Sequence, residues 1–146
     1  MNNVRLDLKE EVQKRLDESI AILNDGREFI SSAYLYSDTG IHCERQFNFT
    51  NRKHAKEKLS KMIKKTNAYM VITIMNAWIS NNVHSRPRYA LDRRTAICVY
   101  GETVKENMMS YVEYHKDSNN KIVVGVTNTI PDGCDGALAN YFEKLK

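Results

Sequence analysis

Cysteine, proline and glycine are all scarce in this chain of 146 residues, which holds three, two and six of them respectively. The three cysteines are widely spaced and form no C-x-x-C pair, which excludes a disulfide scaffold and a zinc ribbon and indicates reduced thiols. No apolar run is long enough to span a bilayer, and the first residues lack the apolar stretch of a secretory signal. We therefore expect a cytoplasmic protein without a membrane partner.

The chain also lacks the short motifs that identify common enzymes and nucleotide sites. It contains no G-x-x-x-x-G-K-[ST], G-x-G-x-x-G, H-E-x-x-H or G-x-S-x-G. No group of histidines, cysteines and carboxylates has the spacing of a zinc or calcium site. We expect no catalytic residue, no metal and no cofactor. The enzymatic alternative is a small thiol enzyme or hydrolase, whose best nucleophile is Cys134 in a loop that contains glycine.

Positive charge is concentrated in one block of the sequence. Residues 51–94 contain eleven basic and two acidic residues, a net charge of +9. Residues 1–50 carry a net charge of −3 and residues 95–146 one of −2, so the whole chain has +4. A local excess of this size attracts anions.

Hydrophobic periodicity predicts three helices and six strands. Apolar residues at spacings of three and four predict helices over Asp7–Asn24, Thr50–Asn67 and Ala137–Lys146. Aromatic and β-branched segments predict strands over Glu28–Ser37, Ile41–Thr50, Tyr69–Ile79, Thr95–Tyr100, Met108–His115 and Lys121–Asn128. In the second of these strands, alternation puts Ile41, Cys43, Phe47 and Phe49 on one face.

The order of these elements, α-β-β-α-β-β-β-β-α, predicts one α+β domain over residues 1–146 with a largely antiparallel sheet. This order is similar to that of roadblock-type and profilin-like small domains. The run from Ala77-Trp78 through Pro87 to Arg93-Arg94-x-Ala96 resembles a loose group of small bacterial α/β proteins with no agreed activity. The likeness covers about residues 69–101, and Asn76 stands where that group often has an acidic residue. Both likenesses imply a fold and no function.

Two groups of cations are candidates for anion binding. The first group consists of four arginines in and just after a polar loop: Arg86, Arg88, Arg93 and Arg94. The planar guanidinium of arginine can donate two parallel hydrogen bonds to phosphate or carboxylate oxygens. Lys61, Lys64 and Lys65 on the second helix add long-range attraction. Tyr89 and Trp78 are near enough in sequence to stack on a base, although Trp78 on an apolar strand is also typical of a core residue. A solvated, functionless charged face is the alternative for the helix.

These observations favour a non-enzymatic protein that captures an anionic ligand through residues 52–94. A nucleotide or signalling nucleotide is slightly favoured over nucleic acid, for which the sequence implies only non-specific affinity. The alternative is a homodimeric interaction or regulatory module, supported by the apolar strands Tyr69–Ile79 and Ile30–Tyr36. Abundant Asn and Lys are compatible with a low-GC bacterium or its phage as the source.

Overall fold

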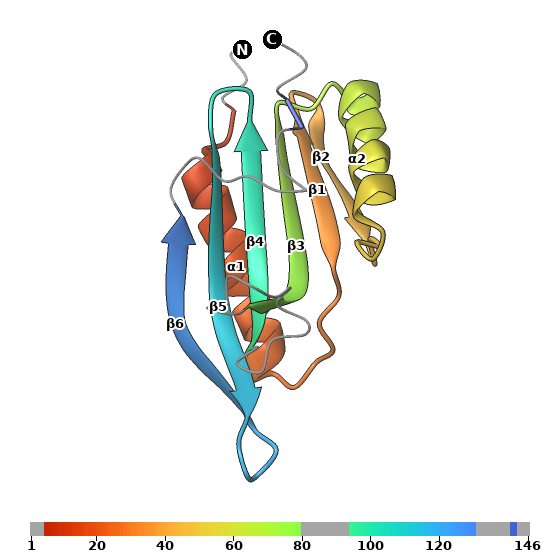
Figure 1. Cartoon of the computed structure of the whole chain (residues 1–146). Helices are drawn as coiled ribbons and strands as arrows, with labels where there is room; N and C mark the ends of the chain where they lie inside the picture. The colour runs from red at the N-terminus through yellow and green to blue at the C-terminus, as the bar shows by residue number, and fades with distance from the viewer. Residues whose placement is uncertain (1–4, 80–93, 131–140, 143–146) are drawn as a thin grey trace.

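The six predicted strands form one sheet, in which every neighbouring pair is antiparallel (Figure 1). The computed structural model describes residues 5–79, 94–130 and 141–142. Its elements are α1 (Leu8–Asn24), β1 (Ser32–Ser37), β2 (Gly40–Arg45), α2 (Arg52–Thr66), β3 (Met70–Ile79), β4 (Arg94–Thr103), β5 (Asn107–Lys116) and β6 (Ile122–Ile130). The strand order across the sheet is β2-β1-β3-β4-β5-β6. The α+β prediction is confirmed.

The two helices cover opposite faces of the sheet. Successive side chains of a strand point to opposite sides, so alternate residues of one strand pack against different helices. Even-numbered β3 residues such as Met70 and Ile72 pack with α1, together with Val99 of β4. Val71 packs instead with α2, as does Leu35 of β1. Figure 1 shows α1 crossing behind β4 and β5, whereas α2 stands beside β1 and β2. β3 therefore lies between two cores, as its two apolar faces predict.

A buried polar network fixes α1 to the sheet. Arg15 Nε donates a hydrogen bond to the Tyr36 hydroxyl (3.1 Å), which donates in turn to Glu11 Oε1 (3.0 Å). Arg15 also donates to Glu18 Oε1 (2.8 Å), and its guanidinium lies 4.0 Å from the centre of the Tyr34 ring. Because each buried charge has partners, the network limits the cost of burying Arg15 and Glu11.

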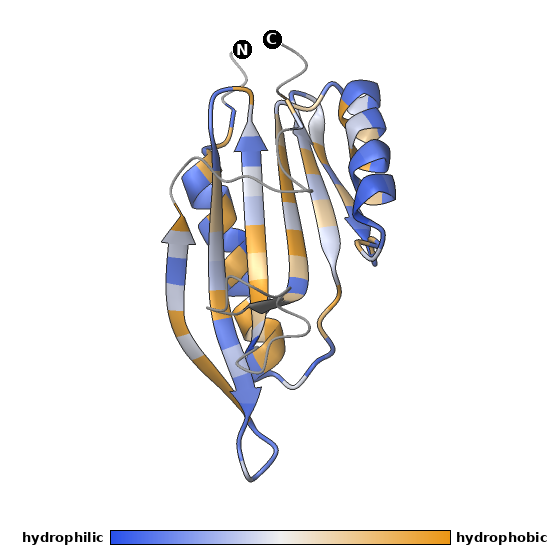
Figure 2. Cartoon of the chain, viewed as in Figure 1, coloured by the Kyte–Doolittle hydropathy of each residue, from blue (hydrophilic) through white to orange (hydrophobic). Residues whose placement is uncertain are grey.

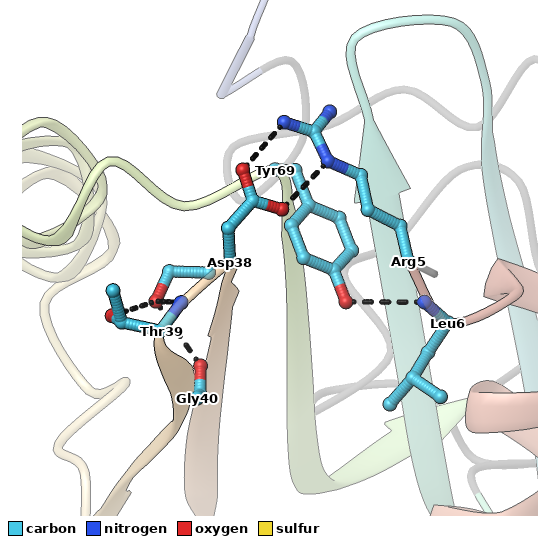
Figure 3. A network of polar contacts seen from close by, with 7 residues as sticks. Arg5, Leu6, Asp38, Thr39, Gly40 and Tyr69 are labelled. Atoms are coloured by element: carbon cyan, nitrogen blue, oxygen red, sulfur yellow. Dashed lines mark hydrogen bonds and ion pairs between the residues drawn. The ribbon is translucent and has the colours of Figure 1, made fainter. Parts of the chain in front are cut away.

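The residues before α1 are attached to the first hairpin at the other end of the helix. Arg5 donates two hydrogen bonds to the Asp38 carboxylate, at 2.9 and 3.0 Å, and lies 4.8 Å from the centre of the Tyr69 ring (Figure 3). The Leu6 amide donates to the Tyr69 hydroxyl at 3.1 Å. The hydrogen bond from Arg5 lowers the pKa of Asp38. These exposed contacts set the direction in which the chain enters α1, with little effect on global stability.

The second predicted strand is wrong beyond Arg45. β2 ends there, Gln46 takes a positive φ of 56°, and the chain leaves the sheet. Phe47 and Phe49 are buried against α2, whereas Ile41 and Cys43 are exposed on the edge strand. The apparent alternation joined two different environments, an exposed strand and a connection buried under a helix.

Other differences concern the ends of elements. β1 begins at Ser32 rather than Glu28, and β4 continues past Gly101 to Thr103. Of the third predicted helix, Ala137–Lys146, only Tyr141 and Phe142 are described, and they are buried but not helical. No helix in the described part of the chain is both long and apolar enough to cross a membrane.

Candidate functional site

The second helix is built to bury one narrow stripe and leave the rest of its surface to solvent. Asn51 caps its N-terminus by accepting a hydrogen bond from the His54 amide at 3.1 Å, and Asn67 ends it in the left-handed conformation (φ 55°). Ala55, Leu59 and Ile63 are its buried residues. In Figure 2 most of the α2 ribbon has the colours of hydrophilic residues.

The outward face of α2 carries mainly positive charge. We define the α2 basic face as the exposed residues Lys53, His54, Lys61, Lys64 and Lys65. They project opposite the buried stripe, since helical residues advance by about 100° each. Glu57 is the single acidic residue of the helix. The basic face extends about 18 Å from residue 53 to residue 65 at about 1.5 Å per residue.

Within the described residues, the lysines of this face have no ion-pair partner. Lys58, on its flank, differs: its Nζ lies 3.5 Å from Glu44 Oε1 and 5.0 Å from the centre of the Phe47 ring. The charge of Lys58 is thus partly neutralised within the molecule. Lys61, Lys64 and Lys65 form no salt bridge with another described residue and are exposed to solvent. Their charges are therefore not neutralised by another described residue.

Arg94 lies far from these lysines. It is the first residue of β4 and stands opposite Ile79, the last residue of β3. Lys64 and Lys65 come just before the other end of β3, which spans ten residues or about 30 Å. A single small anion therefore does not contact Arg94 and these lysines together. Arg94 also forms an ion pair with Glu113 of the neighbouring strand β5.

The other predicted ligand-binding residues fall outside what the structure describes. Arg86, Arg88, Tyr89 and Arg93 belong to the segment 80–93, and their grouping stays a prediction. Trp78 is placed in β3 opposite Thr95, but its side chain is not described. Cys134 is likewise outside the described residues.

A buried polar cluster around Glu102, on the α2 side of the sheet, was missed by the sequence reasoning. Glu102 is only 4% exposed; it accepts a hydrogen bond from the Tyr100 hydroxyl and another from the Phe142 amide at 2.8 Å. Burial raises the pKa of the neighbouring Tyr141. The sequence signal of this cluster is the alternation of Cys98, Tyr100 and Glu102, which share one face of β4. The predicted strand ended at Tyr100 and therefore left Glu102 out. This cluster attaches residues 141–142 to the sheet.

The thiol of Cys98 is not suited to nucleophilic chemistry. It is buried on β4, and burial raises its pKa to about 11, although the charge of Arg52 acts in the opposite direction. At neutral pH the thiol is therefore protonated, whereas nucleophilic attack requires the thiolate. Cys43 is exposed on the edge strand β2.

The groove beside α1 has the wrong charge for an anion. It measures about 770 Å³ and is lined by side chains of α1 and by Met108, Ser110 and Thr129. Four carboxylates and two lysines border it: Asp7, Glu10, Asp17, Glu18, Lys9 and Lys14. An anionic ligand would be repelled here, so the basic face of α2 is the better candidate.

No protein-family model, curated protein or solved structure matches this chain. The likeness noted over residues 69–101 therefore carries no family assignment.

Proposed function

We propose that this chain is a non-enzymatic binding protein that captures a phosphate-bearing polyanion through its basic region, residues 52–94, with the α2 basic face as the contact surface. The observation that carries the proposal is the row of exposed lysines without ion-pair partners in the described residues. Phosphate contacts of lysines release counterions and supply non-specific affinity for nucleic acid.

The shape of the surface favours an extended polyanion over a single nucleotide. Small-molecule sites are concave and enclose most of their ligand. The lysines of the α2 basic face project instead from the outer side of a helix, over about 18 Å. An extended phosphate backbone can follow such a row, whereas a mononucleotide would touch one or two of its charges.

The test is nucleic-acid binding at low salt, measured by fluorescence anisotropy with a labelled oligonucleotide and with a labelled nucleoside triphosphate. A triple variant, Lys61→Gln with Lys64→Gln and Lys65→Gln, removes three charges from the α2 basic face. Its matched control, Lys9→Gln with Lys14→Gln and Lys121→Gln, removes three exposed charges from α1 and the β5–β6 turn.

The proposal expects the wild type to bind the oligonucleotide more tightly than the triphosphate. It also expects the α2 variant to lose most of the affinity and the control to keep it. Equal losses in the two variants would mean that net charge alone attracts the polyanion. Absence of binding by the wild type at low salt would refute the proposal.

A further inference from the structure

The groove between α1 and the last two strands, called the α1 groove below, is long and has buried residues at its base. Its volume is about 770 Å³. Met108 and Ser110 of β5 line it at only 7% and 2% exposure, together with Thr129 of β6. Exposed side chains of α1 form its rim, from Asp7 to Glu18, over about 17 Å at about 1.5 Å per residue. Such a shape suits an elongated ligand.

The rim of the α1 groove is acidic. Four carboxylates and two lysines border it, a net charge of −2: Asp7, Glu10, Asp17, Glu18, Lys9 and Lys14. Glu18 pairs with Arg15. Within the described residues Glu10 and Asp17 form no ion pair, and neither do the two lysines. The negative charges of Glu10 and Asp17 are therefore not neutralised by another described residue.

The base of the α1 groove offers a hydrogen-bond donor as well as apolar surface. Ser110 Oγ and Thr129 Oγ1 are 3.0 Å apart and share one hydrogen bond. Two hydroxyls carry two hydrogens, and the bond between them uses one, so the other is left to donate. A peptide carbonyl accepts such a hydrogen, whereas a protonated polyamine has no acceptor. Met108 in the same groove is a surface for the methylene stem of a lysine.

We propose that the α1 groove binds an extended, lysine-rich segment of a partner protein. Charge complementarity selects this occupant: its ammonium groups meet the carboxylates of Glu10 and Asp17, and its main-chain carbonyls meet the hydroxyls at the base. A groove of about 17 Å takes about five extended residues at about 3.3 Å each. The inference is independent of the proposed function, because α1 and α2 cover opposite faces of the sheet.

The test is fluorescence anisotropy with labelled, end-blocked tetralysine, and with spermine as a competitor of equal charge. Salt of about 0.1 M screens the net positive charge of the chain beyond about 10 Å. Glu10→Gln with Asp17→Asn removes two carboxylates from the rim. Asp25→Asn with Glu28→Gln is the matched control, since it removes two exposed carboxylates outside the α1 groove. Circular dichroism checks that the variants fold.

We expect the wild type to bind tetralysine more tightly than spermine. The rim variant should lose affinity for tetralysine by about fivefold or more, since two surface ion pairs are removed. The control should keep the affinity of the wild type. A second rim variant, Lys9→Gln with Lys14→Gln, makes the rim more acidic and should bind more tightly than the wild type, by about the same factor.

Four outcomes would overturn the proposal. Equal losses in the rim variant and the control would assign the binding to net charge alone. Tighter binding of spermine would make the α1 groove a polyamine site. Absence of tetralysine binding by the wild type would leave the groove without this ligand. Self-association seen by light scattering and abolished in the rim variant would make a second copy of the chain the occupant. The rim variants leave α2 unchanged, so nucleic-acid binding is tested separately.

Discussion

Gly101 of β4 lies directly against Val12 of α1. A Cβ atom built on Gly101 would come within 2.6 Å of Val12 Cγ2 and within 2.6 Å of Leu8 Cδ1. Both of these side chains are buried in the core between α1 and the sheet. The missing side chain of Gly101 thus lets the helix approach the centre of the sheet, and glycine in a strand often marks such a close approach.

Gly101→Ala is therefore expected to destabilise the fold by about 1–3 kcal/mol, the usual cost of forcing extra volume into a packed core. Urea denaturation followed by circular dichroism measures the change. The control is the same substitution in a Val12→Ala background, in which one of the two colliding atoms is absent. The cost of Gly101→Ala should then be smaller. An equal cost in both backgrounds would show that the contact with Val12 is not its source.

Tyr36→Phe tests the polar network that holds α1. The substitution removes the hydroxyl that accepts from Arg15 and donates to Glu11, and both of these buried side chains lose a partner. We expect a loss of stability of about 1–3 kcal/mol. Tyr34→Phe is the matched control, because it keeps the ring that faces the Arg15 guanidinium. The network would have no net stabilising role if the two variants unfolded at the same urea concentration.

Stability is expected to decrease in alkaline solution, beginning near the ordinary cysteine pKa of 9.0. Burial raises the pKa of Cys98 to about 11, so above pH 9.0 the unfolded chain releases a proton that the folded chain still holds. The unfolded state then binds fewer protons, and the free energy of unfolding falls as pH rises. Tyr36, whose pKa is also raised by burial, adds to the fall above its ordinary value of 10.0.

Urea denaturation at neutral and alkaline pH measures this dependence for Cys98→Ala and for Cys43→Ala. The first variant removes the buried thiol and should flatten the onset of the decrease. The second removes an exposed thiol and should leave the pH dependence unchanged. A profile that is the same in Cys98→Ala as in the wild type would assign the decrease to the tyrosines alone.

The elements that were predictable from the sequence are those whose pattern reflects one environment along their whole length. α1 and β3 have continuous patterns and were predicted to within a residue or so. The segment Ile41–Thr50 failed because burial under α2, a tertiary contact, produced the same alternation as a strand. The predicted strand Thr95–Tyr100 stops short of Gly101, because the role of this glycine, the close approach of α1, depends on residues about ninety positions away in sequence.

The candidate site was partly predictable for a similar reason. Helical spacing alone places Lys61, Lys64 and Lys65 on the solvent side of α2, and applied to the whole helix it adds Lys53. The separation of these lysines from Arg94 depends on the direction and length of β3, which no local pattern contains. The position of β6 at one end of the sheet depends on the strand order, which the sequence pattern did not determine.

The triple variant Lys61→Gln, Lys64→Gln and Lys65→Gln should also change the salt dependence of nucleic-acid binding. The slope of log affinity against log salt concentration is expected to fall in magnitude by roughly 2 for a single strand, since three lysines at about 0.7 each no longer contact phosphates. Fluorescence anisotropy with a labelled oligonucleotide at several salt concentrations measures this slope. The control variant, Lys9→Gln with Lys14→Gln and Lys121→Gln, should keep the slope of the wild type. An equal fall in both variants would show that the lysines of the α2 basic face make no specific phosphate contact.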